Sequence, residues 1–106
     1  MNKLVLISGS SRGLGAAMAK SFSEAGYKVA INYFKSEKEA KSLSEKLPSQ
    51  SHIFKCDVSS KDDVDAMLKN IKEEFGHHPS ILVNNAMTSY IFNGCLLYTS
   101  PSPRDS

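Results

Sequence analysis

The sequence predicts an α/β protein in which a parallel sheet of about four strands carries helices on both faces. Apolar, strand-like runs alternate along the chain with segments of helical periodicity. The first run, residues 4–7, is apolar throughout, which is typical of a parallel strand buried on both faces. Right-handed crossovers between such units give the strand order 3-2-1-4, with a ligand crevice at the carboxyl ends of strands one and four.

Four strands and three helices are expected before residue 84. The expected strands are Lys3–Ser8, Lys28–Tyr33, His52–Cys56 and Ser80–Val83. The expected helices are Gly13–Ala25, Ser36–Leu47 and Ser60–Phe75. After residue 86 the alternation fades and no further helix or inward-facing strand is predicted. The outer edge of strand four is therefore expected to be unpaired, apolar and prone to association.

The bounds of the helices come from signals at their ends. The first helix has apolar residues on one face and ends at Gly26. The second begins at Ser36 as the N-cap, with Glu39 three positions later in a capping-box pattern. The third begins at Ser60 as the N-cap and ends at Gly76. These signals separate helix from strand without reference to any known protein.

Length and composition restrict the functional classes. A chain of 106 residues is one domain or part of one, and its net charge of +2 gives no indication of binding to nucleic acid or an anionic membrane. Its apolar runs are too short to span a bilayer, and no secretory leader is apparent. Two cysteines do not make a disulfide framework, and His77-His78 in a turn do not make a metal site. We therefore expect a cytoplasmic location, with no metal, nucleic-acid or membrane partner.

Residues 8–15 read Ser-Gly-Ser-Ser-Arg-Gly-Leu-Gly and connect the first strand to the first helix. In such a turn Gly9 permits the tight bend, Gly13 permits close approach of the backbone to a pyrophosphate, and Gly15 lets the helix pack on the strand. The start of the helix then offers unpaired N–H groups to the phosphates. The pattern favours a Rossmann-type dinucleotide site over a turn that serves packing alone.

The expected cofactor is NADP. An NAD site usually has Asp or Glu at the end of strand two, where it accepts hydrogen bonds from the ribose. Here the sequence reads Asn32-Tyr33-Phe34, without an acid. Arg12, inside the glycine-rich turn, has the planar guanidinium that pairs with a 2′-phosphate.

Three motifs, each at the end of a predicted strand, resemble the short-chain dehydrogenase/reductase family over residues 3–94. They are the glycine-rich turn at 9–15, Asp57-Val58, and Asn84-Asn85-Ala86. The closest resemblance is to the 3-oxoacyl-(acyl-carrier-protein) reductases and their relatives. One position departs from the family pattern, since Met87 stands where the third of these motifs usually ends in Gly.

The resemblance implies roles for residues that the physical argument leaves open. It implies that Asp57 binds the adenine amino group beside Val58, and that Ser11 and Arg12 meet the adenosine phosphate region. Ser10 is expected to contact the cofactor as well. It further implies that Leu14 lies at the pyrophosphate and nicotinamide side, and that Asn85 and Ala86 line the ribose and steady strand four. Asn84 is expected to contact the cofactor as well. Without the resemblance, Asp57 fits a turn or cap role as well as a ligand role, and the Asn pair fits a turn.

The catalytic unit of this family, a Ser with Tyr-x-x-x-Lys, is not found in the sequence. The four tyrosines are followed four positions later by Ile31, Glu37, Gly94 and Ser102, and the last lysine is Lys72. No catalytic residue is therefore assigned, and the 106 residues are expected to be inactive as they stand. The string at 95–105, Cys-Leu-Leu-Tyr-Thr-Ser-Pro-Ser-Pro-Arg-Asp, resembles a translated sequencing-library adaptor.

We therefore expect residues 1–94 to be the N-terminal cofactor-binding part of the domain and 95–106 to be a non-native, disordered tail. The resemblance implies a full-length parent, commonly a homotetramer, that transfers a hydride between NADPH and a carbonyl. A 3-oxoacyl thioester is the leading substrate class, as a small molecule or bound to an acyl carrier. The alternatives are a non-catalytic NADP sensor and another doubly wound nucleotide-binding protein, such as a methyltransferase. The lack of an acid near Asn32 argues against the methyltransferase.

Overall fold

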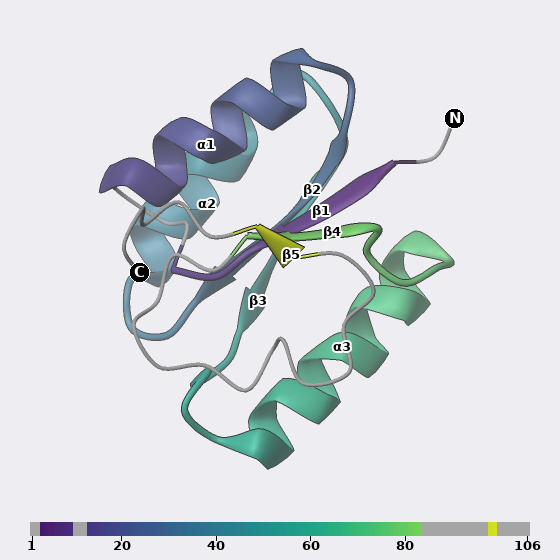
Figure 1. Cartoon of the computed structure of the whole chain (residues 1–106). Helices are drawn as coiled ribbons and strands as arrows, with labels where there is room; N and C mark the ends of the chain where they lie inside the picture. Colours follow the sequence, from purple (N-terminus) through teal and green to yellow (C-terminus); the bar gives the residue numbers. More distant parts are fainter. Residues whose placement is uncertain (1–2, 10–12, 84–97, 100–106) are drawn as a thin grey trace.

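The computed structural model describes residues 3–9, 13–83, 98 and 99. In this part of the chain, strands and helices alternate around a single parallel sheet (Figure 1). The strands are β1 (Leu4–Ile7), β2 (Lys28–Tyr33), β3 (Ser51–Lys55), β4 (Ile81–Val83) and β5 (Tyr98–Thr99). The helices are α1 (Gly13–Glu24), α2 (Glu37–Lys46) and α3 (Lys61–Phe75).

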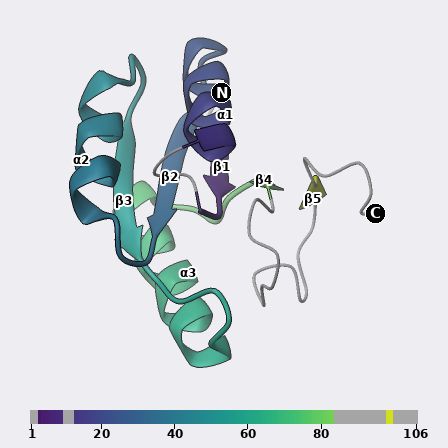
Figure 2. The same cartoon turned by 90° about the vertical axis from the view of Figure 1, so that its left-hand side faces the viewer.

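The sheet has the order β3-β2-β1-β4-β5, and its strands lie side by side in that order in Figure 2. The predicted order 3-2-1-4 is confirmed. β1 is at the centre of the predicted four strands and pairs in parallel with β2 and β4, with Ile7 opposite both Ile31 and Val83. This register brings the carboxyl ends of β1, β2 and β4 to the same edge of the sheet.

The fifth strand differs from the expectation. β5 pairs in parallel with β4, with Leu82 opposite Tyr98 and Val83 opposite Thr99. The prediction that the outer edge of β4 is unpaired is wrong at these residues, because a two-residue strand pairs with the backbone groups on that edge. A Tyr-Thr pair has the β propensity for this pairing, but a two-residue run is too short to give a periodic signal in the sequence. The non-native origin of residues 95–106 stays a prediction.

The sheet separates two apolar cores. α3 covers one face, where it packs on alternate strand residues such as Leu4 and Leu6. α1 and α2 cover the other face, over Val5 and Ile7 (Figure 1). All four residues of β1 are fully buried, which explains why this strand is apolar throughout. Among the described residues, no helix is both long and apolar enough to cross a lipid bilayer.

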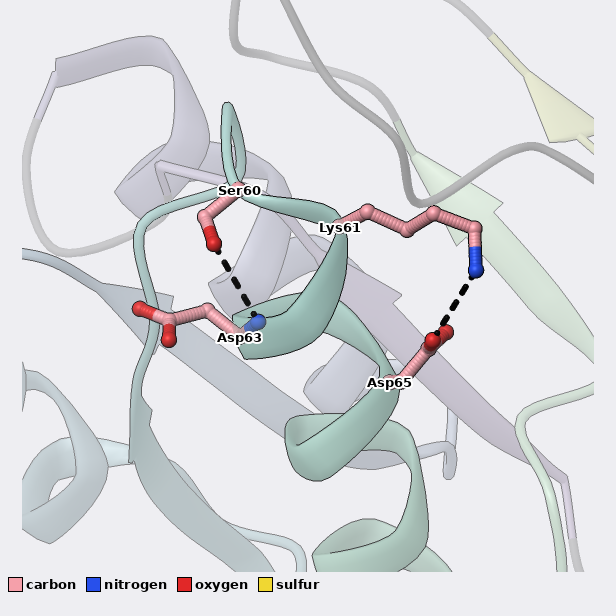
Figure 3. Close-up of polar contacts among 4 residues, drawn as sticks. All are labelled: Ser60, Lys61, Asp63 and Asp65. Atoms are coloured by element: carbon pink, nitrogen blue, oxygen red, sulfur yellow. Dashed lines mark hydrogen bonds and ion pairs between the residues drawn. The ribbon is translucent and has the colours of Figure 1, made fainter.

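Both α2 and α3 begin at the predicted N-cap serines, but only the serine before α3 makes a side-chain capping bond. The Ser60 side chain accepts a hydrogen bond of 3.4 Å from the Asp63 N–H (Figure 3). At the other end of α3, Gly76 adopts the left-handed conformation. Ser36 is the N-cap residue of α2 as predicted, but its side chain makes no capping hydrogen bond. Its ψ of 57° lies outside the extended region that directs a cap hydroxyl to the first helical N–H groups, whereas Ser60 is extended.

Candidate functional site

The predicted site residues that the structure describes lie where the strands end. They are Gly9, Gly13, Leu14, Gly15, Asn32, Tyr33, Asp57 and Val58. The remaining predicted residues lie outside the described part of the chain, namely Ser10, Ser11, Arg12, Asn84, Asn85 and Ala86. A hydrogen bond from the Gly9 N–H to the Asn32 Oδ1 (3.0 Å) joins the turn after β1 to the end of β2.

Two glycines of the turn adopt backbone conformations that disfavour any side chain. Gly9 has φ of +62° and Gly13 has φ of +66°, both in the left-handed region. α1 begins at Gly13 and has no acidic residue in its first turn, so its positive end is not neutralised there. A Cβ atom built on Gly13 has no described atom within 4 Å. The start of α1 therefore fits a phosphate group at close range.

The next two residues of α1 face opposite environments. Gly15 is buried against the sheet side of the helix, as its packing role requires. Leu14, by contrast, is 59% exposed. Leu14 thus presents apolar surface beside the glycine turn.

Asn32 does not present its side chain to the surface. It is 2% exposed and lies on the α3 side of the sheet, where its Nδ2 donates to the Cys56 carbonyl oxygen at 3.2 Å. Its neighbour Tyr33 is buried in the opposite core. Burial and the nearby Glu37 carboxylate raise the pKa of the Tyr33 hydroxyl. The first well-exposed residue after β2 is Phe34, with Lys35 Nζ at 5.7 Å from its ring.

Asp57 follows β3 and organises the turn into α3. Its Oδ1 accepts hydrogen bonds from the Ser59 N–H (3.0 Å) and the Ser59 hydroxyl (2.6 Å). These two bonds lower the pKa of Asp57, so the carboxylate is ionised at neutral pH. Val58 is half-buried and packs against the α3-side core. Asp57 thus has a turn role in this structure, which is one of the two readings that its residue type allows.

Sequence reasoning missed Ser59, which holds the Asp57 carboxylate. A signal for it was present, because Ser two positions after Asp at the end of a strand is the pattern of an Asx-turn. The inward direction of Asn32 was also missed. Alternation along β2 puts Asn32 on the same face as Ala30, and both faces of this sheet are covered by helices.

Among the described residues at this edge, Cys56 does not have the character of a nucleophile. Burial raises the pKa of the Cys56 thiol to about 12, so it stays protonated at neutral pH. Within the described residues, no three His, Cys, Asp or Glu side chains are grouped closely enough to hold a metal ion. The geometry can position a ligand, and no described residue here is placed to react with it.

A parallel sheet with this order, a glycine turn after its central strand and a helix starting at that turn together define a Rossmann-type α/β domain. Residues 9–102 match the family described as enoyl-(acyl carrier protein) reductase. The chain belongs to the short-chain dehydrogenase/reductase family.

Two curated relatives illustrate the match. The chain is 37% identical over 89 residues to 3-oxoacyl-(acyl-carrier-protein) reductase of Staphylococcus epidermidis, covering 81% of this chain and 36% of the relative. It is 40% identical over 86 residues to acetoacetyl-CoA reductase of Paracoccus denitrificans, covering 81% of this chain and 34% of that protein. The chain therefore spans about a third of the length of the curated relatives that it matches.

Solved structures give the same fold. A dehydrogenase/reductase from Sinorhizobium meliloti superposes with a TM-score of 0.75 at 26% identity, covering 79% of this chain and 34% of that one. A short-chain dehydrogenase from Burkholderia cenocepacia, solved in complex with NADP, superposes with a TM-score of 0.72 at 37% identity. That match covers 79% of this chain and 35% of the Burkholderia protein.

Proposed function

We propose that this chain binds NADP(H) at the carboxyl edge of its sheet. The observation that carries the proposal is the pair of left-handed glycines between β1 and α1. Gly9 follows β1, and Gly13 begins α1 with no described atom within 4 Å of its Cβ position. Backbone N–H groups at the start of a helix are suited to a pyrophosphate, which is the part that all dinucleotide cofactors share. The NADP complex of the Burkholderia relative supports the choice of ligand class.

The preference for NADP over NAD rests on charge. Residues 32–34 at the end of β2 include no acid, and the next charged residue is Lys35. A 2′-phosphate at this end of the sheet would meet no carboxylate from β2, and it would find a guanidinium partner in Arg12. Ser10, Ser11, Asp57, Val58, Asn84, Asn85 and Ala86 complete the proposed cofactor contacts. Asn32 and Tyr33 are buried and would support the site from behind.

For the whole protein, we propose hydride transfer between NADPH and a carbonyl compound, with a 3-oxoacyl thioester as the leading substrate class. The names of the Staphylococcus and Paracoccus relatives support this class, because both act on 3-oxoacyl or acetoacetyl thioesters. The cofactor would supply the hydride, and the residues of this chain would hold and orient it. A homotetramer and a cytoplasmic location complete the proposal for the whole protein.

A second candidate is a protein that binds NADP without catalysis. In this alternative, the cofactor-binding part is itself the functional unit. Two proteins are needed to separate the candidates: this chain, and the longer product of the source gene after resequencing beyond Gly94. For each, NADPH oxidation is measured with acetoacetyl-CoA as the substrate. Turnover by the longer product alone supports the reductase. Cofactor binding by both without turnover supports the sensor.

The proposal is tested by titrating the chain with NADPH and with NADH while following nicotinamide fluorescence. We expect NADPH to bind at least about tenfold more tightly, because a charge-assisted contact to the 2′-phosphate contributes roughly 1.5–3 kcal/mol. Arg12→Ala should abolish this difference. Arg104→Ala removes the same charge from the other arginine of the chain and should preserve it. Equal affinities of the unmodified chain for the two cofactors would contradict the NADP preference.

A further inference from the structure

Asn32 is a polar side chain in the core with partners on two neighbouring segments. Its Oδ1 accepts from the Gly9 N–H at 3.0 Å, and its Nδ2 lies 3.2 Å from the Cys56 carbonyl oxygen and 3.4 Å from that of Phe54. We propose that Asn32 is the positioning residue of the glycine turn, and that both ends of its amide are needed to fix Gly9 relative to the end of β3. This inference rests on the proposed cofactor function.

The location of Asn32 in the sheet allows its side chain to contact both segments. β2 lies between β1 and β3 in the sheet, so a side chain at its carboxyl end reaches the segments that follow both neighbours (Figure 2). One of these segments is the turn that begins at Gly9. The other begins at Asp57, directly after Cys56. Asn32 thus links the two segments from which we expect contacts to the pyrophosphate and to the adenine.

An amide is the functional group that fits these partners. The Gly9 N–H requires an acceptor, and the carbonyl oxygens of Cys56 and Phe54 require a donor. An ionised Asp would still accept from Gly9, but it would place negative charge against the two carbonyl oxygens. Leu has a similar volume and would leave all three backbone groups without this partner. The amide is therefore not interchangeable with its isosteres.

Among the described residues, the titratable neighbours Cys56 and Tyr33 keep their protons at neutral pH. Burial raises the pKa of the Cys56 thiol to about 12 and also raises the pKa of the Tyr33 hydroxyl. Asp57 and Asp63 lie beyond the end of β3, and Met67 of α3 contacts the Asn32 Nδ2 at 3.7 Å without a charge. A carboxyl introduced at position 32 would thus be the new titrating group, with its pKa raised by burial and by the facing carbonyls.

The first measurement is amide hydrogen exchange of the cofactor-free chain by nuclear magnetic resonance. Gly9 is exposed as a residue, yet its N–H points to a buried acceptor. We expect its exchange, normalised to the intrinsic rate, to be slow, like that of the amides within β1. Free exchange of the Gly9 N–H in the unmodified chain would overturn the proposal. This result does not depend on whether any variant folds.

The second measurement compares Asn32→Asp with Asn32→Leu, and uses Asn70→Asp as the control. Asn70 is exposed on α3, so Asn70→Asp makes the same chemical change away from the turn. At pH 8 we expect Asn32→Asp and Asn32→Leu to lose at least about tenfold in Gly9 protection and in NADPH affinity. Lowering the pH to 5 should restore part of both losses in Asn32→Asp alone, because the protonated carboxyl regains a donor.

The outcomes separate this inference from the proposed function. If Gly9 protection follows residue 32 but the unmodified chain does not bind NADPH, the positioning role stands and the cofactor proposal fails. If the unmodified chain binds NADPH and both Asn32 variants keep its affinity and Gly9 protection, the positioning role is overturned and the cofactor proposal stands. Equal losses at pH 5 and pH 8 in Asn32→Asp would overturn the requirement for a donor.

Discussion

Single residues at the carboxyl edge of the sheet determine what the site can hold. Gly9 and Gly13 supply left-handed backbone, and Asn32 supplies a buried amide behind them. The left-handed backbone at these two glycines could be expected from the sequence, because few residues other than glycine serve in such a turn. The direction of the Asn32 side chain was not, because a polar residue at a strand end suits a surface position equally well. The tertiary contacts of Cys56 and Gly9 decide between these positions.

A matched pair of alanine variants can separate the effect of Gly13 on stability from its effect on cofactor binding. Gly13 and Gly76 both have positive φ and open space at the Cβ position. Gly13→Ala and Gly76→Ala should therefore each lower the free energy of unfolding by about 1 kcal/mol, the cost of left-handed backbone for a residue with a Cβ. Only Gly13→Ala should weaken NADPH binding, since its methyl group would project toward the pyrophosphate. Urea denaturation and the cofactor titration measure the two effects.

Equal NADPH affinity in the Gly13→Ala and Gly76→Ala variants would contradict the placement of the pyrophosphate at Gly13. If Gly13→Ala lowered the free energy of unfolding much more than Gly76→Ala, the added methyl group would have to meet atoms at Gly13 other than those described.

Cys56 predicts a specific dependence of stability on alkaline pH. Its pKa is raised to about 12 in the folded chain, above roughly 8.5 for an unfolded thiol, so the folded state holds this proton more tightly. The resulting stabilisation is complete below about pH 8.5 and is lost as the pH rises toward 12, at up to ~1.4 kcal/mol per pH unit. In a Cys95→Ser background, Cys56→Ala should flatten this decline. Urea unfolding from pH 7 to 10 measures it.

Tyr33 also has a raised pKa and adds to the same decline, so Tyr33→Phe is the control that isolates the thiol. Identical pH dependence with and without Cys56 would mean that the thiol is not protected by burial. Alkylation by iodoacetamide gives an independent check, since Cys56 should react slowly until the chain unfolds.

At the scale of elements, periodicity and cap residues gave bounds within one residue of the observed ones for all four predicted strands and three helices. The signals that worked are local, such as the apolar run of β1 and Gly76 after α3. Two other features could not be predicted in this way, because they depend on backbone conformation or on residues distant in the sequence. Ser36 has the right residue type for a cap, but its backbone conformation does not direct the hydroxyl to α2. β5 depends on a neighbour far away in the sequence.

The two predicted caps therefore provide a test at this scale. Ser60→Ala removes an observed capping hydrogen bond and should lower the free energy of unfolding by about 1 kcal/mol. Ser36→Ala changes the same residue type at the start of α2, where no such bond exists, and should have a clearly smaller effect. Thermal and urea denaturation followed by circular dichroism measure both. If Ser60→Ala and Ser36→Ala lowered the free energy of unfolding equally, the Ser60 capping hydrogen bond would contribute no measurable stability.

The neighbouring ion pair should contribute little by comparison. Lys61 pairs with Asp65, as Figure 3 shows. Its Nζ lies 3.2 Å from the Asp65 Oδ2, and both side chains are more than half exposed. Exposed pairs at this spacing contribute roughly 0.3–0.5 kcal/mol and are weakened by salt. The side-chain cap at Ser60, rather than the charge pair, is thus the main stabilising contact drawn at the start of α3. Because the Ser60 N–H also bonds the Asp57 carbonyl oxygen at 2.9 Å, this helix start is joined to the turn that contains Asp57.

At the scale of the whole molecule, the sheet has two unequal sides around β1. On one side β2 and β3 pair over several residues, and on the other β4 pairs with β1 over three residues and with β5 over two. The residues of both described cores come from positions 4–83. Stability should therefore come chiefly from β1 to β4 and their three helices, with β5 acting mainly to cover the outer edge of β4.

Two truncations test this division. A chain that ends at residue 99 retains β5, and one that ends at residue 94 lacks it. We expect both to keep the circular dichroism spectrum and NADPH affinity of the full chain, because neither loses a described core residue. The shorter chain should self-associate more strongly in sedimentation experiments, because the outer edge of β4 then lacks its strand partner. Loss of cooperative unfolding or cofactor binding in the 94-residue chain alone would instead make residues 95–99 an integral part of the fold, and would contradict their expected non-native origin.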